Sequence, residues 1–385
     1  MPHRYNRFFH YFLNRELSEL YFTVAIRSFA LSLITIFVPI YLFEKGFSIN
    51  EIFLFYSIFS ASAAIMVYFS SKLSARIGIK HGILSSIPLL ITFYIIIKFV
   101  EAKPIFFIAP ILLGIQASLF WVNFHTDFAE FSSRRFRAEQ ISGYIIICLI
   151  LTALGPLVGG FFIHYVGFNL LFILVALLLL TSVIPLFLSK EIYVRKDFSL
   201  RKVKESLKEI KPLGLTGFIG YGFVLSASVA WPLFMFLVLK AHTSTGSLVS
   251  LSLFVSILSN FFIGKLGDKL SRKNILMVGS FLYSLIWLLA FLSKSIFSIV
   301  LVNVLLGFIG PSSVGGPVFD ALSYDMTKRK NVAEIIAIRE LTIRLSMAFS
   351  FFLLSFFASL KLAFIVGSVG CVLAVIFSKK FKGNF

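Results

Sequence analysis

Gly264-Lys265-Leu266-Gly267-Asp268-Lys269-Leu270-Ser271-Arg272-Lys273 separates two long apolar runs of the chain. These residues include four cations, one carboxylate and two glycines, so the stretch is too short for a domain and too polar to enter hydrocarbon. It predicts a tight cytoplasmic hairpin whose charges hold the ends of neighbouring helices. A weaker copy, Ser71-Lys72-Leu73-Ser74-Ala75-Arg76-Ile77-Gly78-Ile79-Lys80, lies about half a chain earlier and indicates that one unit is repeated.

The composition is that of a membrane protein. Of 385 residues, 58% are hydrophobic and only 14% are charged, whereas soluble proteins carry about 25% charged residues. The net charge is +19, but the cations lie in short loops at alternate ends of apolar runs, which argues against nucleic-acid binding. Cys148 and Cys371 both fall inside apolar runs and indicate neither a disulfide framework nor a metal site.

Twelve apolar stretches are long enough to cross a bilayer, which takes about 20 residues. They cover approximately residues 18–43, 50–70, 82–100, 104–128, 140–163, 168–189, 213–239, 246–266, 274–294, 297–323, 333–357 and 360–378. The sequence therefore predicts an all-α polytopic membrane protein with twelve transmembrane helices.

Lys and Arg residues are unevenly divided between the two sides of the predicted membrane. With the N-terminus in the cytoplasm, 27 of them fall on the cytoplasmic side and 6 on the outer side. Because these residues accumulate in cytoplasmic loops, both termini are expected in the cytoplasm and the protein in the cell membrane. Residues 1–19 are polar and aromatic, so a cleaved signal peptide is not expected.

The longest polar segment, residues 190–211, divides the chain into two halves. Apolar residues recur in it at helical spacing from Leu200 to Ile210, which predicts an amphipathic helix on the inner membrane surface. This linker is expected to join an N-terminal six-helix bundle, residues 1–189, to a C-terminal six-helix bundle, residues 212–385.

The two halves share features at nearly constant offsets of 193 to 195 residues. The matched pairs are Val38-Pro39 with Trp231-Pro232, Arg76 to Lys80 with Lys269 to Lys273, and Glu130 with Asp325. Agreement in three regions predicts a duplication, with two parallel six-helix pseudo-repeats enclosing a path at the membrane midplane.

With these features the chain resembles the major facilitator superfamily of secondary transporters over essentially its whole length. The resemblance is carried by the loop after the second helix of each half, with the pattern G-x-L-x-D-[RK]-x-x-R-[RK]. The second-half stretch matches it through Gly264, Leu266, Asp268, Lys269, Arg272 and Lys273. The first-half copy keeps Arg76 and Lys80 but has Ser71 and Ala75 in place of the glycine and the aspartate.

The resemblance implies a gating role for this loop. Asp268 would hold the cytoplasmic end of helix five, near Arg134 to Glu139, and so stabilise an outward-open state. Because Ala75 cannot make the matching contact with helix eleven, asymmetric gating is expected.

A second resemblance lies in helix five, where Gly155-Pro156-Leu157-Val158-Gly159-Gly160 is similar to the end of a motif common in antiporters of the family. Proline removes a backbone hydrogen bond and the glycines allow a close neighbour, so Gly155, Pro156, Gly159 and Gly160 are candidates for a hinge. Simple helix packing is the alternative. The family's fourth-helix arginine has no counterpart in residues 112–121, which argues against proton-coupled drug efflux.

Polar side chains inside the spans are candidates for solute binding, because their burial in lipid is costly. Arg27 is expected to contact an anionic solute or a cavity carboxylate, or to form a structural pair. Gln116 and Asn123 share a stripe of helix four and could hydrogen-bond a solute. His125 faces nearly opposite that stripe and is expected to be a packed or interfacial residue rather than a proton relay.

Helices ten and eleven supply further candidates. Ser313 and Asp320 share a face of helix ten after a Gly- and Pro-rich interruption, which often marks a binding helix. Asp320 is the leading coupling carboxylate, with an inner-end salt bridge as the alternative. Glu340 precedes Arg344 by four residues, the favourable order for an intrahelical pair, which either neutralises itself or serves the cavity or proton coupling. Arg339 is expected to point elsewhere.

The sequence thus predicts a secondary transporter that moves a small-molecule solute across the lipid bilayer by alternating access, with protons as a candidate coupling ion. Three intramembrane arginines favour an anionic or amphiphilic solute. No phosphate loop of the G-x-x-x-x-G-K-[ST] type occurs, so no nucleotide cofactor is expected. A multidrug-type efflux antiporter is the alternative within this class.

Two other classes are weighed against a transporter. A non-transporting receptor or scaffold is compatible with the eroded first-half loop. A membrane-embedded lipid enzyme would need His, Asp or Cys clustered at one depth, such as paired metal ligands. The six histidines are scattered over both faces of the membrane, so neither catalysis nor a metal site is expected.

Overall fold

A computed structural model describes residues 15–131, 148–185, 198–267, 271–327 and 331–381, and the predictions for Arg134, Glu139, Asp268 and Lys269 fall outside these ranges. The helices of the first half are α2 (Arg15–Ser32), η1 (Thr35–Phe37), α3 (Val38–Glu44), α4 (Ile49–Ile77), α5 (Ile79–Ile96), η2 (Ile97–Phe99), α6 (Lys103–Phe131), α8 (Gly155–Val166) and α9 (Phe168–Ser182). Those of the second half are α10 (Leu200–Leu239), α11 (His242–Gly267), α12 (Arg272–Leu292), α13 (Ile296–Ile309), η4 (Gly310–Ser312), α14 (Pro317–Asp325), α15 (Val332–Leu354) and α16 (Leu360–Ser378).

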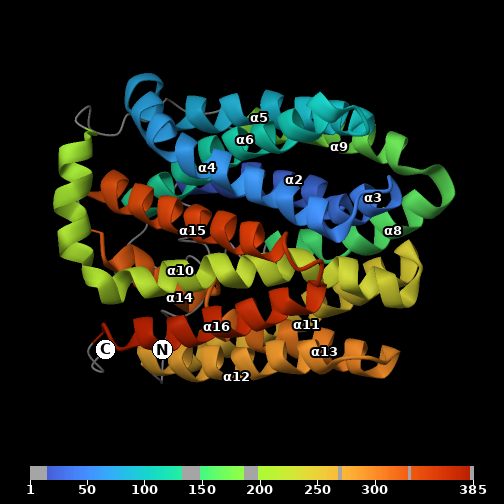
Figure 1. The fold of residues 1–385 in the computed structure, drawn as a ribbon. Helices are drawn as coiled ribbons and strands as arrows, with labels where there is room; N and C mark the ends of the chain where they lie inside the picture. The colour runs from blue at the N-terminus through green and yellow to red at the C-terminus, as the bar shows by residue number, and fades with distance from the viewer. Residues whose placement is uncertain (1–14, 132–147, 186–197, 268–270, 328–330, 382–385) are drawn as a thin grey trace, which may run out of the picture.

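The helices run side by side in two bundles, with α2 to α9 in one and α10 to α16 in the other (Figure 1). Helical backbone is expected because a bilayer offers no water to satisfy peptide groups. Short polar caps start several helices between the apolar runs. Ser48 and Glu51 form a reciprocal capping box at α4, and Ser271 caps α12.

Ten helices in the described part of the chain are long and apolar enough to cross a membrane. Two further predicted spans fall outside this group for identifiable reasons. Helix α9 is only 15 residues long, and α15, with 23 residues, carries Glu334, Arg339, Glu340 and Arg344. The all-helical membrane fold is therefore confirmed, while the count of twelve spans and the orientation of the termini stay predictions.

The described part of the linker, from residue 198, is continuous with the seventh predicted span. Helix α10 extends over 40 residues, is capped by Ser199, and contains Pro212 and Pro232. Its first turns run across the ends of the bundle helices before it turns to lie alongside them (Figure 1). Pro212 accounts for a bend there, because proline removes a helix hydrogen bond. On the first turns, Ile210 is buried against Ile335 and Ile338 of α15.

The tenth predicted span is interrupted, as its Gly- and Pro-rich sequence predicts. Helix α13 ends at Ile309, a single 3-10 turn follows, and α14 begins at Pro317. Gly315 has a positive φ of 86°, a conformation that residues with a Cβ rarely adopt. After this break, Asp320 in the first turn of α14 lies beside Arg339 of α15.

Helix α15 lies at the boundary of the two bundles, packed against α4 and α6 of the first half and α10 of the second (Figure 1). Phe351 of α15 packs on Phe53 and Tyr56 of α4, and the Ser57 hydroxyl donates to the Ala348 carbonyl at 3.0 Å. A second contact between the halves joins α8 to α11.

Candidate functional site

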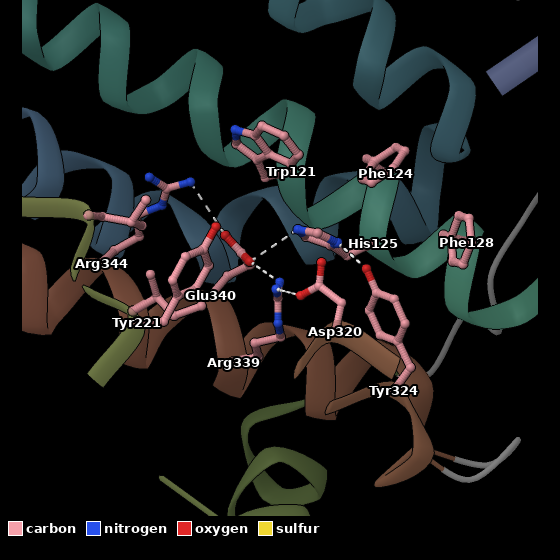
Figure 2. Close-up of a pocket in the computed structure, with 12 residues that line it drawn as sticks. Trp121, Phe124, His125, Phe128, Tyr221, Asp320, Tyr324, Arg339, Glu340 and Arg344 are labelled. Atoms are coloured by element: carbon pink, nitrogen blue, oxygen red, sulfur yellow. Dashed lines mark hydrogen bonds and ion pairs between the residues drawn. The ribbon is translucent and has the colours of Figure 1, made fainter. Parts of the chain in front are cut away.

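A cavity of about 220 Å³ lies between the two bundles and is called the ionic cavity (Figure 2). Its wall from the first half comes from α6, and the opposite wall comes from α10, α14 and α15. The lining residues are Trp121, Phe124, His125, Phe128, Tyr221, Leu225, Asp320, Tyr324, Arg339, Glu340, Ile343 and Arg344. Aromatic rings and charged groups thus line the same cavity.

Arg339 is the centre of the charged group. Its guanidinium donates to the Asp320 carboxylate of α14 at 2.7 Å and to the Glu340 carboxylate at 2.7 Å. The Arg339 side chain is only 2% exposed, so both bonds lie in a low-dielectric environment where ion pairs are strong. The prediction that Arg339 points elsewhere is therefore wrong. Its fork-shaped head reaches sideways along α15 and across to α14.

Glu340 is shared by several partners. Besides the Arg339 guanidinium, the Glu340 carboxylate lies 3.5 Å from the guanidinium of Arg344, which confirms the predicted intrahelical pair. His125 Nε2 of α6 also lies 3.5 Å from this carboxylate (Figure 2). Because His125 belongs to the first half and Glu340 to the second, this contact joins the two bundles inside the cavity.

His125 also lies within hydrogen-bond distance of the Tyr324 hydroxyl through Nδ1. It is buried, as expected of a packed histidine, but its place in the cavity lining was not predicted. The polar stripe of α6, which the sequence predicts to face a solute, lies against the neighbouring helices of its own bundle. The opposite side, with His125, faces the other half.

The ionisable groups of this lining are balanced in formal charge. The two arginines, Arg339 and Arg344, are matched by the two carboxylates of Asp320 and Glu340. Removing one charge from such a buried group costs about 3–5 kcal/mol, because its partner is left uncompensated. The arrangement can therefore exchange one partner for another, or take up a proton together with a negative charge, without building up net charge.

Four of the predicted solute contacts lie elsewhere. Arg27 donates to Gln116 at 3.3 Å and its guanidinium lies 3.6 Å from the centroid of the Phe120 ring. Asn123 donates to the Leu119 carbonyl of its own helix, and Ser313 donates to the Gly310 carbonyl. The described lining of the ionic cavity includes none of these four, whereas Asp320, Glu340 and Arg344 meet there.

The gating loop is described only in part. Helix α11 continues through Gly267, so Gly264 lies in a helix rather than in the predicted hairpin. Arg272 pairs with Asp325 at the end of α14 at 3.1 Å, a contact within the second half. In the first-half copy Arg76 is exposed and Lys80 is buried. Lys273 is half-buried at the start of α12.

The glycines of the helix-five motif provide close packing. The helix is broken at residues 153–154 and resumes at Gly155, with Pro156 in its first turn. A Cβ on Gly159 would collide with the Leu33 carbonyl oxygen, and one on Gly160 would come within 2.6 Å of the His242 carbonyl oxygen. The first contact lies within one bundle and the second joins α8 to α11 of the other.

A further contact between the halves lies at their predicted outer end. His242 Nε2 lies 3.0 Å from a carboxylate oxygen of Glu44, which ends α3. The imidazole is surrounded by the rings of Phe37, Phe168 and Phe236. The two bundles therefore also meet closely at this predicted outer end.

Two helix bundles that enclose a buried, charge-lined cavity are the architecture of a membrane transport protein. A sequence model of the Major Facilitator Superfamily matches residues 20–241 and 213–382, and the chain belongs to that superfamily. An uncharacterized MFS-type transporter of Bacillus subtilis strain 168, YqjV, is 30% identical over 184 residues. That match covers 45% of this chain and 44% of the relative.

Solved structures share the fold at low sequence identity. The human organic anion transporter MFSD10 superposes with a TM-score of 0.69 at 12% identity, covering 94% of this chain and 97% of that one. A single-site variant of the E. coli fucose:proton symporter FucP gives a TM-score of 0.72 at 10% identity, covering 96% and 98%. The POT family transporter PepTSo gives 0.72 at 10% identity, covering 95% and 97%.

Proposed function

We propose that this protein is a secondary active transporter that couples proton movement to transport of an amphiphilic solute with an acidic group, by alternating access around the ionic cavity. The observation that carries the proposal is the charge-balanced group of Arg339, Asp320, Glu340 and Arg344, buried where the two bundles meet. Intramembrane ionisable groups mark solute or proton pathways. The aromatic lining suits the apolar part of an amphiphile.

Asp320 is the proposed proton-accepting group. Its carboxylate holds one side of the Arg339 guanidinium, at 2.7 Å, while Glu340 holds another. An acidic solute that takes the place of Asp320 on Arg339 would leave an unpaired buried carboxylate unless Asp320 takes up a proton. Anion and proton would then enter together, which keeps the site neutral and couples the two movements.

Alternating access would need the outer contacts to open. The Glu44–His242 contact and the close approach of Gly160 to His242 join different bundles at the predicted outer end. Separation of these contacts would admit solute from the predicted outer side. The contact between His125 and Glu340 would break when the cavity opens toward the cytoplasmic side. Such transitions between two packed arrangements are rigid-body movements of whole bundles.

A multidrug-type antiporter is the second candidate. Five aromatic residues, Trp121, Phe124, Phe128, Tyr221 and Tyr324, line the same cavity as two carboxylates. Aromatic faces and carboxylates also attract lipophilic cations. The two candidates differ in the sign of the solute, so one experiment separates them.

The test is proton movement in proteoliposomes that contain a pH-sensitive dye, with pools of organic anions or lipophilic cations added outside. The proposal expects a response to an anion pool that disappears in Asp320→Asn. A response to cations alone would favour the multidrug antiporter. If correctly folded protein gives no proton movement with either pool, proton-coupled transport is contradicted and a receptor or scaffold is favoured.

A further inference from the structure

Four charged residues of the ionic cavity form a row in which the sign of the charge alternates. The Asp320 carboxylate contacts Arg339 at 2.7 Å, and Arg339 contacts one oxygen of Glu340 at 2.7 Å. The other Glu340 oxygen contacts Arg344 at 3.5 Å. Figure 2 shows this order across the cavity, from Asp320 on the right to Arg344 on the left. The row therefore begins with a carboxylate and ends with an arginine.

The two arginines of the row differ in how fully their terminal nitrogens are occupied. Nη1 and Nη2 of Arg339 each donate to a carboxylate, and its side chain is only 2% exposed. Arg344 donates to Glu340 through Nη2, and its side chain is 9% exposed. Its Nε is enclosed by protein and cannot meet a solute. Nη1 of Arg344 is not enclosed in this way and makes no hydrogen bond to the described residues, so this atom is the donor open to the cavity.

Tyr221 of α10 supplies a second donor at the same end of the cavity as Arg344 (Figure 2). Its hydroxyl makes no hydrogen bond to the described residues, and the residue is half-buried. The ring is held by its neighbours, because it packs on Phe319 with 5.6 Å between ring centroids and a Cβ on Gly315 would lie 2.5 Å from it. Packing thus fixes the phenol ring and leaves its hydroxyl available to a ligand.

We infer that Arg344 receives the solute, whose acidic group binds both Nη1 of Arg344 and the hydroxyl of Tyr221 and so completes the alternating row. The inference rests on the proposed function and names the receiving residue and the solute class for it. This binding precedes any exchange of partners on Arg339. Glu340 lies beside the new anion, but two arginines already share its charge. One guanidinium can hold two carboxylates, as Arg339 does.

The surroundings of Arg344 indicate that the solute is a small aromatic carboxylate. A carboxylate offers two oxygens to the two donors. Trp121 of α6 lines the opposite wall, and the Phe59 ring of α4 lies with its centroid 5.9 Å from the Arg344 guanidinium, so a flat ring finds aromatic partners. The cavity volume of about 220 Å³ is below the range of about 300–1,000 Å³ typical of small-molecule sites, which favours a solute with a single ring.

Two brominated probes of nearly equal shape test this site. 4-Bromobenzoate is an anion at neutral pH, 4-bromobenzamide is its uncharged counterpart, and the bromine of either quenches a tryptophan that it contacts. Trp121 lines the ionic cavity, whereas Trp231 and Trp287 line a different cavity. Quenching of the full-length protein in detergent measures binding, and Trp121→Phe reports where the probe lies.

Wild-type protein should bind the benzoate at least about ten-fold more tightly than the benzamide, and Trp121→Phe should lose most of the quenching. Tyr221→Phe removes only the hydroxyl and should weaken benzoate binding about five-fold, the loss of one hydrogen bond. Arg344→Lys keeps the charge but not the planar fork and should weaken benzoate binding about ten-fold. Both variants should affect the benzamide much less.

Arg272→Lys is the matched control, because Arg272 pairs with Asp325 outside the lining of the ionic cavity. It should leave the affinity for both probes unchanged. Asp320→Asn removes a negative charge from the far end of the row and should bind the benzoate at least as tightly as wild type. Thermal unfolding checks that each variant is folded, and Tyr221→Phe carries the test if Arg344→Lys is not.

The inference is overturned if quenching persists in Trp121→Phe, if Tyr221→Phe and Arg344→Lys weaken both probes equally, or if the benzoate does not bind. Its failure is distinguishable from failure of the proposed function. Anion-driven proton movement in a protein whose benzoate affinity does not depend on Arg344 or Tyr221 would leave the transporter standing and remove this site. Benzoate binding with the expected dependence, but without proton movement for any anion, would do the reverse.

Discussion

Arg339 bridges two carboxylates on different helices, with its guanidinium 2.7 Å from Asp320 of α14 and 2.7 Å from Glu340 of its own helix α15. One arginine thus ties the interrupted tenth span to the helix that packs against the first half. A change in the protonation of Asp320 alters the partners of Arg339. Because Glu340 also meets His125 of α6, that change acts at the interface between the bundles.

Asp320→Asn should uncouple transport from protons. Asparagine keeps the size of the side chain but cannot take up a proton, so solute exchange between equal pools should persist while uptake driven by a pH gradient falls at least about ten-fold. Uptake and counterflow of the active anion in proteoliposomes measure the two activities. Asp325→Asn is the matched control on the same helix, since Asp325 pairs with Arg272 away from the cavity lining. Gradient-driven uptake at the wild-type rate in Asp320→Asn would contradict the coupling role.

Glu340→Gln should destabilise the protein, because it leaves Arg339 and Arg344 facing one carboxylate in a buried site. The expected loss is about 3 kcal/mol of unfolding free energy. Adding Arg344→Gln restores the balance of charge and should recover part of that loss. Thermal unfolding of both variants in detergent checks this. The idea is contradicted if adding Arg344→Gln to Glu340→Gln destabilises the protein further, by as much as Arg344→Gln does on its own. Charge balance would then not be the cause.

Gly160→Val should block transport without preventing folding. A side chain at this position meets the His242 carbonyl oxygen, so it keeps α8 and α11 from their close contact between the halves. The predicted outer end could then not close, and solute uptake should fall at least about ten-fold, with binding of solute from that side retained. Val158→Leu on the same helix is the control, because Val158 is 44% exposed on the outside of the bundle. Equal loss in both variants would indicate a general packing defect.

Much of the fold could be predicted, because the bilayer requires long apolar helices and glycine and proline mark their breaks. The interruption of the tenth span and the Glu340–Arg344 pair both follow from local spacing, and the structure confirms them. Local spacing also identified Asp320 as a candidate, since a carboxylate in an apolar run stands out.

The composition of the site was harder to predict, because it depends on which side of each helix faces the other bundle. The stripe with Gln116 and Asn123 is more polar than the side with His125, yet it faces its own bundle, where Gln116 binds Arg27. Sequence periodicity gives the angle between such sides but not the partner of either one. Arg339 was misplaced for a similar reason, since α14 approaches it only through the break before Pro317.

Cross-linking of the two bundles to each other tests whether this protein works by alternating access. The contact between Glu44 and His242, at the predicted outer end, joins the two bundles, with 3.0 Å between the side-chain atoms. A pair of cysteines at these positions, in a background with Cys148 and Cys371 replaced by alanine, can be joined by a short reducible cross-linker. The joined protein could not open at this end.

The control pair is Lys45 and Glu101, which approach to 2.9 Å within the first bundle and move together in any rigid-body transition. The measurement is solute-driven proton movement in proteoliposomes before cross-linking, after it, and after reduction. If the bundles must separate here, complete cross-linking of the 44/242 pair abolishes the signal, reduction restores it, and the 45/101 pair transports throughout. Undiminished proton movement with the 44/242 pair fully cross-linked would contradict alternating access at this interface.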